Sequence, residues 1–368
     1  MNKKKIICVH LLNDFSGSPN VLRNAIDILG ENYEIELYTN KGEGFLSNLN
    51  VKYRYINYRF YKFPLFTIVA LLIAQTQLFF KIIVNHYNDN CIVLVNTVYP
   101  FSASIAGKIL KKKVIYYVHE VRLRNWLMDK LTFKIASICS DYIIYVSQYL
   151  RSQVAPRLKT KSTVIYNTVS STFLSAQEHK KVSDSNRLVF NVILIASNKI
   201  FKGTHTMIKL AEEMQSFHNI QFTMMLNGEK KAIEELKNSC KDITNLLILD
   251  SSYNINDLYA NSNLLLNLSI SEDWIETFGL TILEGFFYGI PAIVPDIGGP
   301  TEIVDNNKNG FHVNTRDINE IKEKIMLLYD KLDIYKEFSL SAKVKAQKFS
   351  LYEYQKQLTQ VFKEVHNL

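Results

Sequence analysis

Two glutamates on either side of a glycine are the residues whose types and spacing most suggest chemistry. They lie in SEDWIETFGLTILEGFFYGIPAIVPDIGGPTEIVDNNKNGFHV, residues 271–313. The preceding apolar run NLLLNLSI predicts a buried strand, and the apolar spacing near residues 280–288 predicts a helix. Ligands of open α/β sheets bind at the carboxyl ends of strands. The loop SEDWIETFG is therefore expected to line a binding site.

The start of that helix suits an anionic or strongly polar ligand. Free backbone N–H groups and the helix dipole favour a phosphate or a polar sugar, and Gly279 lets a ligand approach the backbone. Glu276 stands at the mouth of this site. Glu284 lies roughly 7.5 Å beyond Gly279 along a helix that rises about 1.5 Å per residue, near the distance from a diphosphate to a ribose. A carboxylate there can accept hydrogen bonds from two adjacent hydroxyls. From residue types alone, a helix cap at Glu276 and a solvated helix residue at Glu284 remain alternatives.

A lysine and a glycine repeat this arrangement earlier in the chain. In IASNKIFKGTHTMIKLAEEM a predicted strand ends in a loop, and Lys202 and Gly203 begin the next helix. A lysine at that point can neutralise a leaving diphosphate. A lysine before a helix is also a common surface charge, so this motif gains weight only together with its neighbours.

The first half of the chain offers two weaker signals. LLNDFSGSPNVLRNAIDIL places Gly17 in a predicted strand-to-helix turn, where glycine is common for conformational reasons alone. VIYYVHEVRLRNW places His119 and Glu120 at the end of a predicted strand. A lone histidine is often structural, so both residues need support from elsewhere.

Together these motifs resemble the signature of retaining glycosyltransferase family 4. The resemblance rests on two glutamates separated by seven residues, on the motifs E-x-F-G-L and G-G-x-x-E, and on a predicted strand that follows a small residue, Gly and Pro. Further elements occur in the family's order from residue 14 to 313. VIYNTVSSTF resembles the family's interdomain element, with Asn167 matched and the glycine replaced by Thr168. The resemblance implies the GT-B fold: an α/β protein of two Rossmann-like, doubly wound parallel-sheet domains that face each other across a cleft.

The resemblance also implies roles for individual residues. The catalytic set would be Glu276, which approaches the transferred sugar, with His119 and Lys202. The donor-binding set would be Glu284 on the ribose, the backbone amides at the start of the helix, and the residues of the glycine and lysine loops: Phe278, Gly279, Leu280, Gly17, Ser197, Lys199 and Gly203. The family's arginine, about five residues before Lys202, is absent. Ser197 or Asn198 stands in its place, and Lys199 is the candidate substitute.

The implied reaction moves a sugar from a UDP- or GDP-sugar to a glycan or polyprenyl-diphosphate-linked acceptor with retention, in bacterial surface polysaccharide synthesis. We expect no metal or other cofactor, because no D-x-D motif or metal-spaced Asp, Glu and His cluster occurs. Two alternatives keep the same fold: a catalytically silent nucleotide-binding module, suggested by the missing arginine, and a sugar-nucleotide epimerase.

Length and composition agree with two folded domains. The chain has 368 residues, of which 47% are hydrophobic and 21% charged, and short apolar runs alternate with helical patterns. We predict an acceptor-binding domain at 1–170, a nucleotide-sugar-binding domain at 171–345 and a helix at 346–368 that packs back on the first domain. The polar stretch SSTFLSAQEHKKVSDSNR is the expected linker. The scattered residues Cys8, Cys91, Cys139 and Cys240 predict reduced core thiols of a cytoplasmic protein.

The charge is divided unequally between the two halves. Residues 1–172 contain 22 Lys and Arg against 10 Asp and Glu, whereas residues 173–368 contain 21 against 25. The basic half is expected to meet phosphates of a substrate or an anionic membrane surface. Nucleic acid is a poorer fit, because no recognition motif accompanies the lysines.

One apolar segment, FPLFTIVALLIAQTQLFFKIIV at residues 63–84, is nearly long enough to span a bilayer. Gln75, Thr76 and Gln77 near its middle weaken that interpretation. An interfacial helix at the inner face of the cytoplasmic membrane and an ordinary core helix are the other two interpretations.

Overall fold

The chain folds into two compact units. The structure, a computed structural model, describes all residues except 1–3, 60, 62, 179–188 and 368. Unit 1 comprises Met1–Asn167 and Tyr352–Leu368, and unit 2 comprises Thr168–Leu351. The chain therefore passes into unit 2 three residues before the expected boundary at 170, and residues 346–351 belong to unit 2 rather than to the C-terminal segment.

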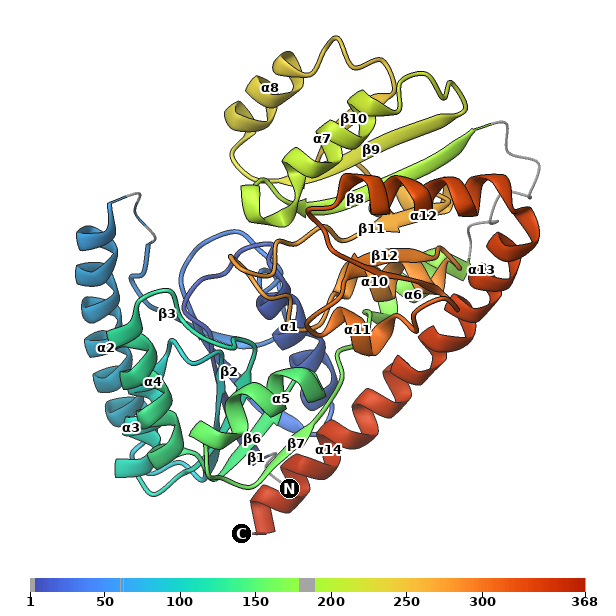
Figure 1. The fold of residues 1–368 in the computed structure, drawn as a ribbon. Coiled ribbons are helices and arrows are strands. Elements are labelled where there is room, and N and C mark those ends of the chain that lie inside the picture. Colours follow the sequence, from blue (N-terminus) through green and yellow to red (C-terminus); the bar gives the residue numbers. More distant parts are fainter. Residues whose placement is uncertain (1–3, 60, 62, 179–188, 368) are drawn as a thin grey trace. The chain divides into compact units, whose positions relative to one another are not determined.

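In the described part of the chain, unit 1 is built on a seven-stranded parallel sheet with the order β3-β2-β1-β4-β5-β6-β7 (Figure 1). The strands are β1 (Lys4–Val9), β2 (Tyr33–Thr39), β3 (Lys52–Tyr55), β4 (Cys91–Asn96), β5 (Lys113–Val118), β6 (Tyr142–Tyr145) and β7 (Ser162–Val164). Their central members are continuous apolar runs, as expected for a parallel sheet with helices on both faces. The strand order reverses between β1 and β4, which makes the ends of these two strands the switch point of the sheet.

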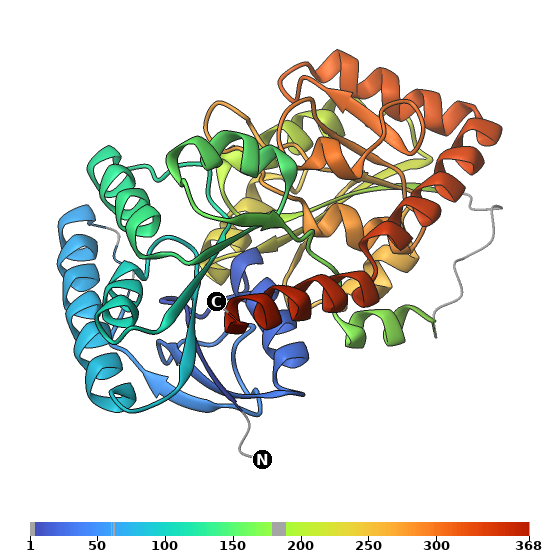
Figure 2. The same ribbon diagram turned by 90° about the horizontal axis from the view of Figure 1, so that it is seen from below.

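Helices connect these strands as right-handed crossovers require. They are α1 (Gly17–Leu29), α2 (Pro64–His86), α3 (Phe101–Ile109), α4 (Trp126–Cys139), α5 (Gln148–Val154) and the short 3-10 helix η1 (Ala155–Arg157). Helix α3 contacts α2 on one side and α4 on the other, so the three lie side by side in one layer (Figure 2).

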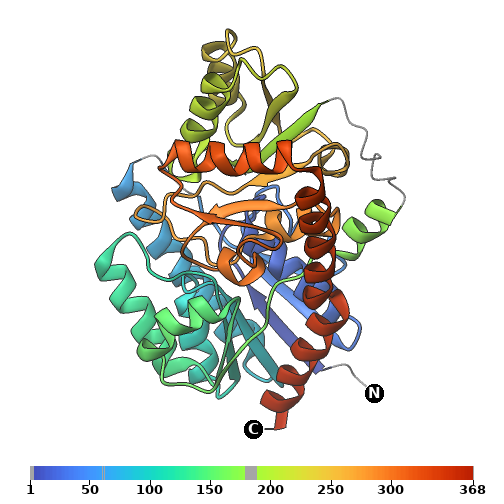
Figure 3. The ribbon, with the colours of Figure 1, turned by 45° about the vertical axis from the view of Figure 1, so that its right-hand side comes forward.

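The last helix, α14 (Leu351–Asn367), returns to unit 1. Its apolar stripe is buried there and comprises Tyr354, Leu358, Val361, Phe362 and Val365. The hydroxyl of Tyr117 at the centre of the sheet donates to the hydroxyl of Tyr354 over 3.4 Å. Near the end of the helix, His366 contacts Lys4 of β1, so both ends of the chain lie in the same unit (Figure 3).

Unit 2 is built on a six-stranded parallel sheet within the described residues, with the order β10-β9-β8-β11-β12-β13. The strands are β8 (Phe190–Ser197), β9 (Ile220–Asn227), β10 (Leu246–Asp250), β11 (Leu264–Leu266), β12 (Ala292–Pro295) and β13 (Gly310–Val313). The helices are α6 (Ser171–Glu178), α7 (Thr204–Glu213), α8 (Lys230–Ser239), α9 (Ile255–Ala260), α10 (Leu280–Phe287), α11 (Pro300–Ile303), α12 (Ile318–Asp330) and α13 (Leu332–Ala346), with η2 (Ile200–Lys202) and η3 (Gln347–Phe349) as 3-10 turns. The switch point of this sheet lies between β8 and β11.

The expected linker is wrong over residues 171–178, which form helix α6. The side chain of Phe173 supplies the reason, because it is buried against the rings of Tyr259 and Tyr288 at centroid distances of 5.9 Å each. A single aromatic residue thus anchors a segment whose composition is otherwise polar. The remaining part of the expected linker, 179–188, lies outside the described residues.

The four cysteines are free and buried in the structure, as predicted. Burial raises the pKa of the Cys91 thiol to about 11 and that of Cys8 further, so these groups stay protonated at neutral pH. They act as small apolar residues of the sheet cores.

Candidate active site

The switch point of unit 2 carries two loops of the same design. Strand β8 runs into η2 and α7, and its sheet neighbour β11 runs into a longer loop and α10. Each helix begins after a glycine in the left-handed region: Gly203 has φ +81° and Gly279 has φ +106°. Glycine is required at both because a Cβ atom is unfavourable there. The two helices therefore begin beside each other at the edge where ligands of such sheets bind.

The two loops are packed together without room for side chains. A Cβ atom on Gly203 would lie 2.3 Å from the backbone oxygen of Leu268, which belongs to the loop after β11. The N–H of Ile270 donates to the carbonyl of Phe201 over 2.8 Å. The position of Lys202 is therefore fixed relative to the loop that carries Glu276.

Lys202 and Glu276 form an ion pair at the centre of this site. Lys202 Nζ donates to Glu276 Oε2 over 2.5 Å, and the two side chains are 20% and 21% exposed. The ammonium also lies 5.6 Å from the centre of the Trp274 ring, which stacks on Phe201 at 5.5 Å. Both charges keep some contact with solvent, so an anionic ligand can reach the lysine.

Two more glycines, Gly298 and Gly299, pack against the backbone of the loop that carries Glu276. The N–H of Gly299 donates to the carbonyl of Glu276 over 2.8 Å. A Cβ atom on Gly298 would lie 2.6 Å from that carbonyl oxygen, and one on Gly299 would lie 2.1 Å from the carbonyl oxygen of Thr277. The Gly-Gly pair of the G-G-x-x-E motif thus allows the two loops to approach closely, which explains its place in the sequence pattern.

The start of α10 has the features expected of an anion site. Its N-cap is Gly279, which offers no side-chain acceptor to the N–H groups of the first turn. Phe278 contributes through its backbone, since its side chain is buried and packs edge-on against Phe349 at 5.9 Å. Leu280 is the first helical residue. The amides at 278–280 are therefore placed at the positive end of the helix dipole.

Glu284 lies one turn further along α10, and it is not the solvated helix residue of the alternative interpretation. The hydroxyl of Tyr259 donates to Glu284 Oε2 over 2.7 Å, and Tyr259 stacks on Tyr288 at 5.6 Å. Burial raises the pKa of Glu284 to about 7, with the Tyr259 hydrogen bond acting in the opposite direction. A carboxyl group with one donor and a raised pKa is poised to accept further hydrogen bonds, which would favour its ionised form.

Ser197 and Lys199 occupy the loop between β8 and η2. Ser197 is the last residue of β8, paired with Asn227 of β9, and its carbonyl accepts from the N–H of Lys199 over 2.7 Å. Lys199 is exposed and precedes η2. The structure thus places both in the same strand-to-helix connection as Lys202.

In unit 1 the corresponding edge is formed by a neutral network. Asn96 ends β4, and its Nδ2 donates to the carbonyl of Ser18 over 3.0 Å, which fixes the orientation of the amide. Nδ2 also lies 3.0 Å from His10 Nδ1, and Oδ1 lies 2.8 Å from His119 Nε2. His119 must therefore donate through Nε2, which leaves the lone pair of Nδ1 as an acceptor for a hydroxyl group.

Burial keeps both histidines of this network uncharged. Desolvation lowers the pKa of His119 to about 3, with a further contribution from His10, and desolvation lowers the pKa of His10 to about 4. The neighbouring Glu120 has its pKa raised to about 7 by burial. In unit 1, then, the carboxyl group titrates near neutrality and the histidines do not.

Gly17 is the first residue of α1, and its backbone is not in the left-handed region. The loop before it is organised by Asp14, whose Oδ1 accepts from the N–H and the hydroxyl of Ser16 over 2.9 and 2.5 Å. The bond from Asn96 to the carbonyl of Ser18 ties the start of α1 to the strand that supports His119. Ser18, the residue after Gly17, and His119 are therefore joined through Asn96.

A strained residue follows Asn96. Thr97 is buried and has φ +70°, in a region that β-branched residues avoid. Its N–H donates to the carbonyl of Tyr117 over 2.9 Å. Backbone strain of this kind is concentrated at functional sites, which supports a functional role for the end of β4.

The described residues contain no group of three or more His, Cys, Asp and Glu side chains placed to hold a metal ion. The charged groups at the edge of unit 2 are instead a lysine and two glutamates with helix N–H groups between them. This arrangement can bind an anion and the hydroxyl groups attached to it.

Comparison with known proteins shows what the chain is similar to. Residues 176–345, nearly the whole of unit 2, match the family model described as glycosyl transferases group 1. This match covers a little under half of the chain and makes unit 2 similar to the domains of that family. A glycosyltransferase of Methanocaldococcus jannaschii is 27% identical over 282 residues, which cover 74% of this chain and 75% of that protein. Sucrose-phosphate synthase 4 of Arabidopsis thaliana is 27% identical over 143 residues, 34% of this chain and only 14% of that protein.

The fold of the whole chain is similar to that of a solved structure that contains a nucleotide sugar. The structure of Anabaena HepE in complex with UDP-glucose superimposes with a TM-score of 0.78 at 17% identity, over 98% of this chain and 99% of that one. The expected GT-B fold, with two Rossmann-like parallel-sheet domains, is thereby confirmed.

Sequence reasoning missed three residues that support the glycosyltransferase site. Tyr259 donates to Glu284, and Asn96 and His10 hold His119. Asn96 could have been noticed as a polar residue that ends the run CIVLVN, in the same place as His119 after its own strand. Tyr259 lies in a short helix and carries no such signal.

Proposed function

We propose that the chain is a retaining, family 4 transferase that moves a sugar from a nucleotide-diphosphate sugar to a glycan or lipid-linked acceptor. The observation that carries this proposal is the placing of Lys202, Glu276 and the uncapped start of α10 at one switch point, with Glu284 one turn behind. A cation and the N–H groups of a helix start without a side-chain cap suit a diphosphate, and a carboxyl further along the helix suits a ribose.

The donor is proposed to be a UDP- or GDP-sugar. The likeness to HepE, whose structure contains UDP-glucose, supports the first of these. A diphosphate carries more negative charge than one carboxylate, so it can draw Lys202 away from Glu276 when the donor binds. Glu276 is then free to face the transferred sugar. Ser197 and Lys199 would complete the phosphate-binding loop in the absence of the family's arginine.

In the proposed reaction the acceptor hydroxyl attacks the anomeric carbon from the face that the diphosphate leaves. The bond from that carbon to the diphosphate oxygen breaks, the bond to the acceptor oxygen forms, and a phosphate oxygen takes the acceptor's proton. Lys202 and the amides of α10 stabilise the charge that develops on the leaving diphosphate. This scheme uses no metal ion. His119 would accept or orient a sugar hydroxyl through its free nitrogen.

The acceptor is proposed to be a polyprenyl-diphosphate-linked glycan at the inner face of the cytoplasmic membrane, in the synthesis of a bacterial surface polysaccharide. The charge of the first half supports this, since its excess of lysines and arginines would attract a diphosphate and an anionic bilayer. The long apolar helix α2 supports it as well.

A donor screen tests the proposal. Purified protein is incubated with UDP-, GDP-, ADP- and TDP-sugars, and release of nucleoside diphosphate is measured for the wild type and Glu284→Ala, with and without EDTA. We expect slow release from one donor, insensitivity to EDTA and loss of release in the variant. Nucleotide binding without release in the presence of acceptor would favour the silent module, and absence of any binding would refute the donor site.

A further inference from the structure

The outer surface of helix α2 is apolar even though the helix belongs to a folded unit. The most apolar 18-residue stretch within residues 66–86 has a mean hydropathy of 1.9, and only 28% of it is buried. The inward face, with Leu71, Ala74, Leu78 and Ile82, is packed inside unit 1. The outward face is exposed and comprises Phe66, Val69, Leu72, Ile73, Phe80 and Val84. A soluble helix would present polar residues there, so this face is fitted to an apolar environment.

Helix α4, in the same layer, continues this surface with a different composition. Its outward side exposes Trp126 by 63%, Leu127 by 59%, Leu131 by 46% and Ile138 by 64%. Ile109, at the end of α3 between the two helices, is exposed by 60%. The surface formed by these five residues and the outward face of α2 is called the α2–α4 face below. Many exposed large apolar side chains on neighbouring helices of one layer are typical of an interaction site.

Basic groups are set among the apolar residues of α4. Lys130 and Lys134 follow one another at helical spacing on the outward side, and Lys130 lies 4.9 Å from the centre of the Trp126 ring. In the part of the chain that the structure describes, neither lysine forms an ion pair with a carboxylate. Their charges are therefore available to an external anion.

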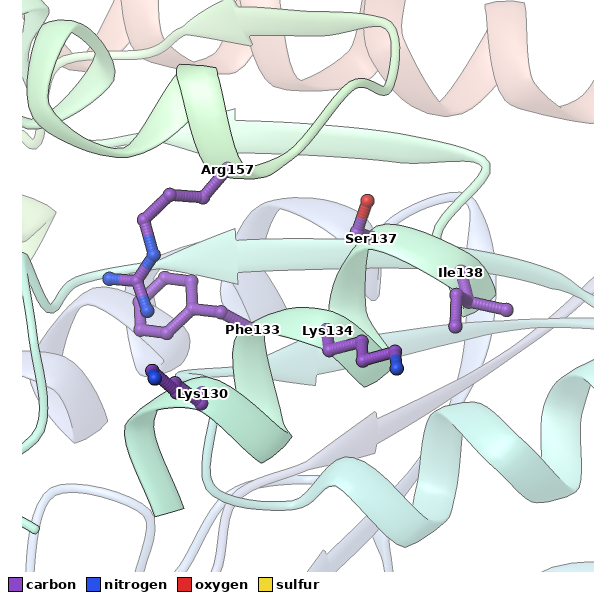
Figure 4. Close-up of a pocket in the computed structure, with 6 residues that line it drawn as sticks. All are labelled: Lys130, Phe133, Lys134, Ser137, Ile138 and Arg157. Atoms are coloured by element: carbon purple, nitrogen blue, oxygen red, sulfur yellow. The ribbon is translucent and has the colours of Figure 1, made fainter. Parts of the chain in front are cut away.

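A cavity of about 330 Å³ lies beside these lysines (Figure 4). It is lined by Lys130, Phe133, Lys134, Ser137, Ile138 and Arg157. The guanidinium of Arg157 lies 3.8 Å from the centre of the Phe133 ring and donates to Asp129 over 2.5 Å, which holds it in place. Two lysines, an arginine that is paired with Asp129, and a hydroxyl thus line a space with an apolar wall, a composition that suits a phosphate attached to an apolar group.

We propose that the α2–α4 face lies on an anionic bilayer, with the apolar side chains in the interface and a lipid phosphate in the cavity of Lys130, Lys134 and Arg157. This extends the membrane part of the proposed function. The interleaving of exposed aliphatic and aromatic residues with lysines is the composition of interfacial helices. Lysines near an anionic surface are attracted to it.

The same observations argue against the other ways to cover this face. A second copy would bring Lys130 and Lys134 against another basic unit, whose charges repel them. A membrane-spanning α2 would have to leave its place in unit 1, where Gln75 donates to the carbonyl of Tyr99 over 2.8 Å and accepts from the N–H of Ser102 over 3.0 Å. Both bonds tie the middle of the helix to the start of α3. The helix is therefore expected to lie along the bilayer surface.

Sedimentation with vesicles tests the proposal. The full chain is mixed with vesicles of phosphatidylcholine alone or of phosphatidylcholine with phosphatidylglycerol, and the bound fraction is measured. We expect strong binding to the anionic vesicles only. The pair Lys130→Glu with Lys134→Glu should weaken it by about tenfold or more, and Leu72→Asp with Ile73→Asp should do the same at constant pocket charge.

Matched controls are available in unit 2. Lys231→Glu changes another exposed lysine, and Leu340→Asp changes a leucine that is 65% exposed; both should leave vesicle binding unchanged. Thermal unfolding of each variant shows whether it is folded. In Trp274→Phe, Trp126 is the remaining tryptophan, and its fluorescence should shift to shorter wavelength with anionic vesicles.

Three results would overturn the proposal: equal binding of the lysine pair and the wild type, equal binding to both kinds of vesicle, and a dimer in solution that Leu72→Asp with Ile73→Asp dissociates. The last would assign the face to a second copy. Vesicle binding requires no donor, and donor hydrolysis requires no vesicle, so failure of this proposal and failure of the transferase proposal are distinguishable.

Discussion

The carboxyl edges of the two sheets have the same architecture and opposite electrostatic character. In unit 2 the edge carries a lysine, two glutamates and the start of a helix without a side-chain cap. In unit 1 it carries two histidines held neutral by burial and joined by an amide. The fold brings polar groups to each switch point, but the residue types decide what can bind. The charged edge suits a diphosphate, and the neutral edge suits hydroxyl groups.

Removal of the cation should give the largest effect. Lys202→Ala leaves Glu276 without its partner and removes the charge that would face the diphosphate, so we expect the turnover of donor hydrolysis to fall by about 10²- to 10³-fold. Lys209→Ala, on the next helix and 61% exposed, is the control and should be silent. Equal turnover in the two variants would remove the lysine from the mechanism.

The next largest effect should be on stability, where glycine substitutions at the two edges should differ. Gly203→Ala places a Cβ in a left-handed residue and against the backbone of Leu268, so we expect unfolding to become easier by at least about 2 kcal/mol. Gly17→Ala at the start of α1 should change stability by less than about 1 kcal/mol. Thermal or denaturant unfolding of the two variants checks the contrast, and a reversed order would contradict the geometry described for both loops.

Donor affinity should depend on pH through Glu284. Its pKa is about 7 in the empty site, so the carboxyl is mostly protonated at pH 6 and ionised at pH 8. Ribose hydroxyls would stabilise the ionised form, which means that binding lowers this pKa and releases a proton below pH 7. Affinity should therefore rise, by up to about tenfold, as pH increases from 6 to 8, and then level off.

Calorimetric titration with nucleotide measures that dependence, and Glu284→Gln should abolish it. Glu120 in unit 1 has a pKa in the same range, so Glu120→Gln is the matched control. If Glu120→Gln and not Glu284→Gln removes the dependence, the titrating group of the donor site is in unit 1.

The smallest effect on activity is expected from a single substitution at the edge of the unit 1 sheet. Asn96→Ala removes the acceptor for His119 Nε2, so the ring is no longer held in one tautomer. We expect kcat/KM to fall by about threefold to tenfold. Nitrogen-15 NMR of the histidines should show His119 protonated at Nε2 in the wild type and a mixture in Asn96→Ala. A single unchanged tautomer in the variant would show that Asn96 does not position His119.

The sequence predicted the fold where the pattern of residues is local. The buried apolar runs predicted most strands. Strands β3 and β13 were not predicted, because their sequences KYRY and GFHV are short and partly polar. Helix α6 was missed because a single buried phenylalanine holds it. The sequence does not decide whether segment 63–84 is a spanning, an interfacial or a core helix. One face of α2 is buried and the other is exposed, and a mean hydropathy does not distinguish the two faces.

The candidate site, like the fold, was predictable where its residues lie in local sequence motifs. Lys202, Gly203, Glu276, Gly279 and Glu284 follow directly from two strand-to-helix loops, and the structure brings them together at β8 and β11. Their supporting contacts come from distant sequence positions: Tyr259 reaches Glu284 from α9, and Asn96 reaches His119 from another strand. Such contacts depend on tertiary packing, which no local pattern encodes.

The return of α14 to unit 1 has a consequence for how the chain reaches its native state during synthesis. The stripe with Leu358, Phe362 and Val365 is fully buried in the first unit, yet it is translated after all of unit 2. A nascent chain therefore carries an incomplete first unit, in which the hydroxyl of Tyr117 does not yet donate to Tyr354, while the second unit already has its whole sequence. Ribosome-bound chains that end before residue 351 should expose this apolar groove to chaperones, and the gap should close only when the final helix emerges from the exit tunnel.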